Sequence, residues 1–209
     1  MKGKFITLEG IDGVGKTTQL ELLKIFAHEK SKDNWIFTRN PGGTELGIEL
    51  REILLNNQTL RVTPLAETLL YIADRAEHIS KFVIPALEED TIIICDRFID
   101  STVAYQGYGR GLNIANIHKL NEIAIQGIKP DLTILFDADP SISFQRAKSR
   151  GQSGDKIEAE GLEFQKKIRA GFLEIAQLEP ERFCIIDVAK KNPSEIHENV
   201  LKEIEKIIT

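Results

Sequence analysis

A glycine-rich octapeptide close to the N-terminus constrains this sequence more than any other feature. Residues Gly10 to Thr17 follow the spacing Gly-x4-Gly-Lys-Thr, between the apolar run Phe5 to Leu8 and a helical pattern. Glycines let backbone N–H groups turn toward an anion in conformations that strain other residues, and a helix N-terminus adds partial positive charge. The pattern therefore predicts a strand, a phosphate-binding loop (P-loop) and a helix, in that order.

This loop also predicts how a nucleoside triphosphate is held. Lys16 would reach the β- and γ-phosphates, and the Thr17 hydroxyl would ligate Mg²⁺. A glycine-rich turn without a ligand is the alternative, and the flanking strand and helix disfavour it. Kinases, switch GTPases and motor ATPases all share such a loop, so the reaction stays open. The residues predicted to bind ATP are Gly10, Ile11, Asp12, Gly13, Val14, Gly15, Lys16, Thr17 and Thr18.

Composition narrows the class of protein. The chain has 209 residues and a formal charge of −5, which argues against a general nucleic-acid binder. It begins without a signal-like apolar segment and contains no run long enough to cross a membrane, so we expect a cytoplasmic protein with no membrane partner. Cys95 and Cys184 lie in apolar runs, which favours buried thiols over a disulfide. The four histidines lack ligand-like spacing, and we expect no structural zinc.

Five short apolar runs alternate with longer stretches of helical periodicity, such as Leu65, Leu69, Ile72 and Ala76. Strands that alternate with helices form βαβ units, and continuously apolar strands suit a parallel sheet covered on both faces. The sequence predicts a single α/β domain over residues 1–209, with three layers (α/β/α) and a mainly parallel five-stranded sheet. The predicted strands are Phe5 to Leu8, Trp35 to Thr38, Thr91 to Cys95, Leu132 to Phe136 and Phe183 to Ile186.

Local signals mark helix starts and a loop. Three prolines are predicted in first helical turns, each after an N-cap residue, and the last helix is expected from about Ser194 to Ile207. Glycines bracket the polar stretch Arg150 to Asp155, which predicts a lid at about residues 146–158 or, alternatively, a merely exposed loop. The predicted cap and proline pairs are Thr63-Pro64, Asp139-Pro140 and Asn192-Pro193.

The third predicted strand ends in Cys95-Asp96-Arg97-Phe98. The carboxyl ends of parallel strands are where open α/β sheets bind ligands. Asp96 could hold Mg²⁺ through water, and the Arg97 guanidinium could clamp a phosphate. A structural ion pair at the strand end is the alternative.

Taken together, these segments resemble the thymidylate kinase family. The resemblance rests on three stretches, and its Ser-Thr-x-Ala-Tyr-Gln-Gly block is the most specific part. It implies a P-loop kinase fold of the bacterial type that transfers the γ-phosphoryl group of ATP to thymidine monophosphate with Mg²⁺, usually as a homodimer. The stretches are Glu9 to Gln19, Thr38 to Thr44, and Asp96 to Gly107.

The same resemblance assigns roles to individual residues. Arg51 and Arg97 match phosphate ligands of the monophosphate substrate, with Arg39 a weaker candidate, while Asp12 and Tyr105 match positions that read the deoxyribose. Without the family, Tyr71 would be read as core packing and Arg75 as a solvated charge. By resemblance, the thymine base meets Tyr71, Arg75, Ser101, Thr102 and Gln106.

Two departures from the family pattern matter. Gly13 occupies the P-loop position where one branch carries arginine, so a transition-state cation would come from the lid, and Lys156 stands where arginine is frequent. Asn40 replaces a glutamate common after Thr38-Arg39, which puts a charge role there in doubt. The predicted catalytic residues are Lys16, Arg97, Arg150, Arg146 and Asp12.

Two other functions remain open from sequence. A kinase for another small phosphate acceptor would share the P-loop. A regulatory nucleotide switch would carry a guanine-reading Asn-Lys-x-Asp motif, which the sequence lacks. The sequence therefore favours a thymidylate kinase over these two alternatives.

Overall fold

A computed structural model describes residues 3–57, 59–143 and 160–208. Its centre is a five-stranded sheet in the order β2-β3-β1-β4-β5, and every pairing is parallel. Each predicted strand is present and differs at its ends by a residue or so. The strands are β1 (Lys4–Glu9), β2 (Trp35–Arg39), β3 (Ile92–Asp96), β4 (Leu132–Asp137) and β5 (Phe183–Asp187).

Helices connect the strands, and three of them run on into short π-helical segments (η1, η2 and η3). The α-helices are α1 (Lys16–Glu29), α2 (Glu45–Arg51), α3 (Pro64–His78), α4 (Ile84–Glu88), α5 (Ile99–Thr102), α6 (Ile114–Ile125), α8 (Leu162–Leu178) and α9 (Pro193–Ile208). The π-helical segments are η1 (Glu52–Asn56), η2 (Ile79–Val83) and η3 (Val103–Gly109).

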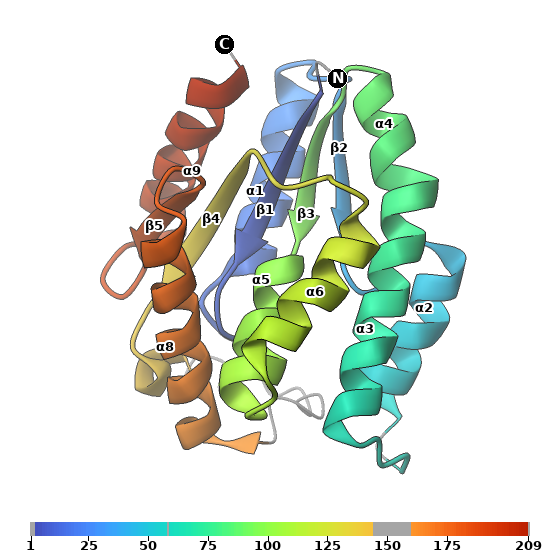
Figure 1. Cartoon of the computed structure of the whole chain (residues 1–209). Coiled ribbons are helices and arrows are strands. Elements are labelled where there is room, and N and C mark those ends of the chain that lie inside the picture. The colour runs from blue at the N-terminus through green and yellow to red at the C-terminus, as the bar shows by residue number, and fades with distance from the viewer. Residues whose placement is uncertain (1–2, 58, 144–159, 209) are drawn as a thin grey trace.

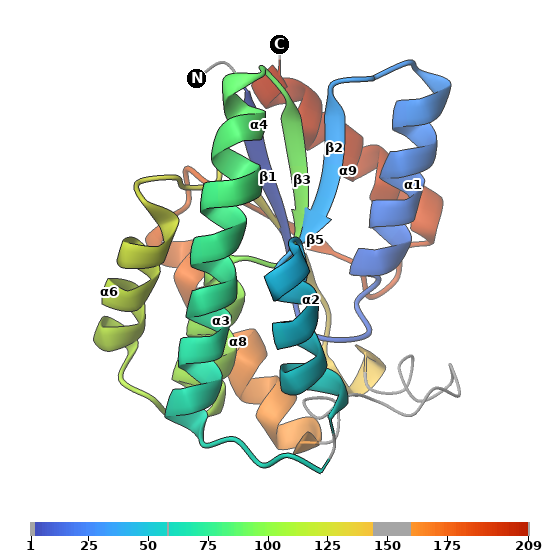
Figure 2. The same cartoon turned by 90° about the vertical axis from the view of Figure 1, so that its right-hand side faces the viewer.

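The sheet is the middle of three layers (Figures 1 and 2). Successive strand residues point to opposite faces, so both faces of these apolar strands need a cover. Phe5 and Ile93 are fully buried in a cluster with Val83 and its neighbours from η2 and α4. Leu23 of α1 and Val200 of α9 belong to the other cluster, together with alternate strand residues. This arrangement confirms the predicted α/β/α fold.

Topology determines where the site lies. The chain passes from β1 to β2 on one side of the sheet and later to β4 on the other side. A crevice opens at the carboxyl ends of the strands where successive connections diverge in this way. The P-loop follows β1, and the Asp96-Arg97 pair follows the neighbouring strand β3. The two sequence motifs therefore meet at one edge of the sheet.

The helix starts follow the predictions closely. Asn192 and Glu195 form reciprocal side-chain to backbone hydrogen bonds of 3.0 and 2.8 Å at the start of α9. Asp139 accepts from the Ser141 amide at 2.9 Å where the helical residues 140–143 begin. Thr63 precedes α3 as predicted, but its side chain makes no capping hydrogen bond within the described residues.

Two burial expectations need correction. Leu65 and Leu69 lie on the outer side of α3 and are half exposed, because the buried face of this helix carries Thr68, Tyr71 and Arg75 instead. Cys95 is buried as expected, whereas Cys184 is partly exposed because it lies on the edge strand β5. Within the described ranges, no helix has the length and apolarity needed to span a bilayer.

Candidate active site

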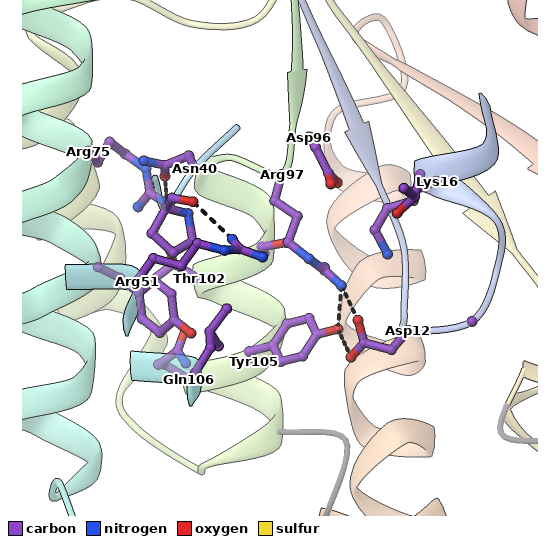
Figure 3. Close-up of a pocket in the computed structure, with 16 residues that line it drawn as sticks. Asp12, Lys16, Asn40, Arg51, Arg75, Asp96, Arg97, Thr102, Tyr105 and Gln106 are labelled. Atoms are coloured by element: carbon purple, nitrogen blue, oxygen red, sulfur yellow. Dashed lines mark hydrogen bonds and ion pairs between the residues drawn. The ribbon is translucent and has the colours of Figure 1, made fainter. Parts of the chain in front are cut away.

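A cavity of about 340 Å³ opens beside the P-loop at the carboxyl edge of the sheet (Figure 3). The P-loop and the loops after β2 and β3 form one side, and α2, α3 and η3 form the other. Its volume is in the range of small-molecule sites. The lining residues are Asp12, Gly13, Lys16, Thr17, Asn40, Pro41, Arg51, Leu55, Tyr71, Arg75, Asp96, Arg97, Ser101, Thr102, Tyr105 and Gln106.

The P-loop has the backbone that its glycines predict. Gly10, Gly13 and Gly15 have φ angles of 138°, 81° and 100°, a region that residues with a Cβ rarely adopt. Lys16 is buried, and its Nζ donates to the carbonyl oxygens of Gly10 and Ile11 at 2.9 and 2.8 Å. Burial, with Arg97 nearby, lowers the pKa of Lys16 to about 8. A bound polyanion would compensate both effects.

Arg97 links the P-loop to the rest of the pocket (Figure 3). Its Nη2 donates to Asp12 Oδ1 at 2.5 Å and to the Tyr105 hydroxyl at 3.0 Å. Its Nη1 donates to the Gly10 carbonyl and to Ser101 Oγ, both at 3.0 Å. Burial opposes the charged form of Arg97, but Tyr105 and Asp12 hold its pKa well above the usual value. The guanidinium is therefore fixed in orientation and cationic.

Glu9 holds the turn that carries Arg97. Arg97 has a left-handed backbone with φ of 66°. The carboxylate of Glu9 accepts from the Phe98 amide at 2.7 Å and from Ser101 Oγ at 2.6 Å. Burial and the neighbouring Asp100 raise the pKa of Glu9 to about 7. A fully buried carboxylate thus stabilises a backbone conformation that is unfavourable by itself.

Tyr71 and Arg75 form the opposite wall, one helical turn apart on α3. Arg75 is only 1% exposed, so the solvated-charge alternative is wrong. Its Nη1 donates to Asn121 Oδ1 at 2.7 Å, and its Nη2 donates to Asn40 Oδ1 at 2.7 Å. Its Nε has no hydrogen-bond partner among the residues that the structure describes. Arg75 is therefore a buried cation held by amide oxygens at the edge of the cavity.

The side chain of Asn40 is hydrogen-bonded to two other side chains of the protein. Besides accepting from Arg75, its amide Nδ2 donates to Asp74. Asp74 also accepts from the Gly42 amide at 3.0 Å, which secures the turn after β2. The neutral amide, with one donor and one acceptor end, satisfies a carboxylate and a guanidinium together. A glutamate at this position could only accept, and it would lose the hydrogen bond to Asp74.

The side chains present suit a divalent cation at the P-loop. Oδ1 of Asp96 is buried and has no hydrogen-bond partner in the described part of the chain. Asp96 and Thr17 both line the cavity next to Lys16. Mg²⁺ prefers one or two carboxylate or hydroxyl oxygens together with water and phosphate oxygens. The donor set therefore fits the predicted metal.

Most predicted site residues converge on this cavity, with several exceptions. Arg39 is exposed and does not line it, and Thr18 is exposed on α1. Arg146, Arg150 and Lys156, the candidate lid cations, lie outside the described residues. Sequence reasoning also missed Pro41, Leu55 and Glu9, although Glu9 adjoins the P-loop pattern. The P-loop residues that do not line the cavity are Gly10, Ile11, Val14 and Gly15.

A P-loop that faces a second site with phosphate-binding cations and an aromatic wall, on a parallel sheet of this order, defines a P-loop nucleoside monophosphate kinase. Comparisons with known proteins agree. The profile of the family described as "Thymidylate kinase" matches residues 8–200. The chain belongs to the thymidylate kinase family.

Individual relatives are similar over nearly their whole length. A thymidylate kinase of Pelotomaculum thermopropionicum is 44% identical, covering 100% of this chain and 95% of the relative. A thymidylate kinase of Synechococcus sp. is 50% identical over 92% of this chain and 90% of the relative. The crystal structure of thymidylate kinase from Ehrlichia chaffeensis matches with a TM-score of 0.79 and 37% identity, covering 97% and 98% of the two chains.

Proposed function

We propose that this protein transfers the γ-phosphoryl group of ATP to the 5′-phosphate of thymidine monophosphate. The observation that supports this most directly is the shared cavity, in which the P-loop lysine Lys16, the cations Arg51 and Arg97, and the α3 wall of Tyr71 and Arg75 all meet. Membership of the thymidylate kinase family supports the same substrate. Thymidylate is the substrate class that uses every one of these groups.

The reaction needs positioning more than acid–base chemistry. The monophosphate already carries a charged oxygen that can attack the γ-phosphorus, so no general base is required. Arg97 and Arg51 would hold this phosphate, and Lys16 would neutralise charge as it develops on the transferred group. Burial and the neighbouring Arg39 lower the pKa of Arg51 from its usual value, and its Nη1 donates to the Pro41 carbonyl at 2.9 Å. Arg51 is thus ordered before a ligand binds.

The nucleoside would bind between α3 and η3. Tyr71 would stack on the base, while Arg75, Thr102 and Gln106 would meet its polar edge. Tyr105 would crowd a ribose 2′-hydroxyl, and Asp12 would lie next to the sugar. The Tyr105 hydroxyl donates to Asp12 Oδ2 at 3.0 Å. Ser101 donates to Glu9 and accepts from Arg97, which favours a part in positioning Arg97 over direct base contact.

Mg²⁺ bound with ATP would be held by Thr17 and, through water, by Asp96. When bound, it would supply charge neutralisation on the phosphate oxygens. Arg150, with Arg146 and Lys156 as alternatives, stays the proposed lid cation that would stabilise the transferred group, as Gly13 provides no side chain in the loop.

A homodimer in the cytoplasm is the further part of the proposal. Four apolar side chains are exposed on α2 and α3, which lie side by side in Figure 2, and Ile48 is 60% exposed. Exposed apolar side chains are compatible with a protein interface on these helices. Sedimentation would test this: a monomer at micromolar concentration would contradict it. These exposed side chains are Leu46, Ile48, Leu65 and Leu69.

The decisive experiment measures ADP release with Mg-ATP and a panel of phosphate acceptors. Thymidine monophosphate should react several-fold faster than deoxyuridine, uridine, cytidine and adenosine monophosphates. Preference for another monophosphate would replace the substrate assignment, and slow ATP hydrolysis indifferent to acceptor would indicate a regulatory nucleotide switch.

A further inference from the structure

Glu67 stands behind the base-binding wall without being part of it. It lies in the first turn of α3, four residues before Tyr71 and eight before Arg75, so the three side chains share one helix face. Glu67 does not line the cavity, whereas Gln106 does. Gln106 Nε2 donates to Glu67 Oε1 at 2.9 Å. The amide nitrogen of Gln106 is therefore directed at Glu67.

Arg110, the residue after η3, also contacts both carboxylate oxygens of Glu67. Its Nε donates to Glu67 Oε1 at 3.3 Å and its Nη2 donates to Oε2 at 3.2 Å. Arg110 also pairs with Glu160, and its guanidinium carbon lies 5.0 Å from the centre of the Phe164 ring. The carboxylate thus has a fixed position between two sets of donors.

This arrangement allows only one orientation of the Gln106 amide. An amide has a donor end and an acceptor end, whereas a carboxylate can only accept. Turning Gln106 round would place its Oε1 against a carboxylate oxygen, which is repulsive. Oε1 has no hydrogen-bond partner within the described ranges, and Gln106 lines the cavity. The pocket side of Gln106 is consequently an acceptor.

We propose that Glu67 is a positioning residue that selects the base: by orienting Gln106, it favours a pyrimidine that carries a hydrogen on ring N3. Thymine and uracil donate at N3, whereas cytosine accepts there, so an oxygen facing N3 attracts the first two and repels the third. This inference rests on the proposed function, because it supposes that the base meets Gln106.

The test compares thymidylate with 5-methyldeoxycytidylate in wild type and Glu67→Gln. In the variant, either orientation of the new amide leaves one Arg110 N–H without an acceptor, because Nε and Nη2 of Arg110 donate to different carboxylate oxygens in the wild type. Neither orientation is therefore enforced, and the variant side chain can offer Gln106 a donor as well as an acceptor. Gln106 is then able to turn round and present a donor to N3 of 5-methyldeoxycytidylate. We expect the ratio of kcat/KM for thymidylate over 5-methyldeoxycytidylate to fall about tenfold or more. The 5-methyl group is common to both substrates, and any effect of the C4 amino group on Arg75 is common to both proteins.

A matched control separates charge loss from orientation. Glu163→Gln removes the same charge from the exposed face of α8, where Glu163 pairs with Lys166, and should leave the ratio unchanged. The paired change Glu67→Gln with Gln106→Glu restores an oxygen on the pocket side and should move the ratio back toward wild type. Thermal midpoints monitor folding. If Glu67→Gln does not fold, Glu67→Asp provides the test: it keeps an acceptor-only side chain and should retain the ratio.

The outcomes are distinct. An unchanged ratio in a folded Glu67→Gln protein, or equal losses on both substrates, would overturn the positioning role and leave Glu67 as structural support. So would failure of the paired change to recover the ratio, or loss of the ratio in Glu67→Asp. A wild-type protein without preference for thymidylate would contradict the proposed function itself.

Discussion

At the scale of single residues, the site depends on side chains that are fixed before any ligand binds. Arg97 has four hydrogen bonds to the P-loop, Ser101 and Tyr105, and Glu9 supports its left-handed backbone. Preorganised cations need little rearrangement when charge develops in a transition state. Because Arg97 is already held in place, the rotamer entropy of its long side chain is lost during folding and not during binding.

Tyr105→Phe tests this preorganisation. The change removes a hydroxyl that accepts from Arg97 and contacts Asp12, each at 3.0 Å. One such bond contributes about 1 kcal/mol, so kcat/KM for thymidylate should fall about five- to tenfold. Tyr108→Phe is the matched control, because Tyr108 lies on η3 outside the cavity and bonds to Glu174. Equal losses from the two variants would contradict the role given to Tyr105.

At the scale of elements, the P-loop packs against the segment that follows β4. Gly13 has φ of 81°, and a Cβ placed there would overlap the backbone oxygen of Ser143. An arginine at this position would meet the same obstacle. The packing between these two elements therefore leaves no room for a side chain at residue 13.

Gly13→Ala should be more destabilising than a change that introduces only backbone strain. Gly127→Ala provides that reference, because Gly127 has φ of 84° and, its chain neighbours aside, no atom of the described residues lies within 4 Å of where a Cβ would stand. We expect a loss of about 1 kcal/mol in the free energy of unfolding for Gly127→Ala. Gly13→Ala should lose about 1–3 kcal/mol more, since the clash is with backbone. Urea unfolding measures the free energy of both variants. Equal losses would show that the backbone at Ser143 moves aside for the added Cβ.

At the scale of the whole molecule, buried titratable groups make stability depend on pH. His78 is fully buried between β2 and η2, where its Nε2 lies 2.8 Å from Thr38 Oγ1 and its ring stacks on Phe82. Its Nδ1 has no partner among the described residues. Burial, with Arg75 nearby, lowers the pKa of His78 from 6.5 to about 4. Between about pH 4 and 6.5, the unfolded chain therefore binds a proton at His78, whereas the folded state does not.

The sign of the effect follows from this difference. The stabilisation from neutral His78 is complete above pH 6.5 and is lost as the pH falls toward 4. At pH 5 the loss should be about 2 kcal/mol relative to pH 7. Chemical unfolding of wild type and His78→Gln at both values tests this: the variant should lose about 2 kcal/mol less on acidification. Glu9 titrates in both proteins, so its contribution cancels. Equal acid sensitivity would contradict the prediction.

Local patterns were enough to predict much of this protein. The strands are apolar because both faces are covered, and the P-loop spacing is dictated by backbone geometry around an anion, so each can be recognised in a short window. Asn40, Leu55 and Glu67 were not predicted as parts of the site. Asn40 depends on Arg75 and Asp74, and Glu67 depends on Gln106 and Arg110. Such pairs form between distant segments and leave no periodic signal.

Local sequence patterns specify the layer architecture, the phosphate loop, and the residue types that could bind two nucleotides. How those residues are used depends on which of them the folded chain brings together. The parallel sheet brings Asp96 and Arg97 beside the P-loop, and α3 buries Arg75 at the edge of the same cavity. The fold also directs the amide nitrogen of Gln106 at Glu67. Hydrogen bonds are directional and pair residues by position in space, so the direction in which a donor or acceptor points is decided only when the chain has folded.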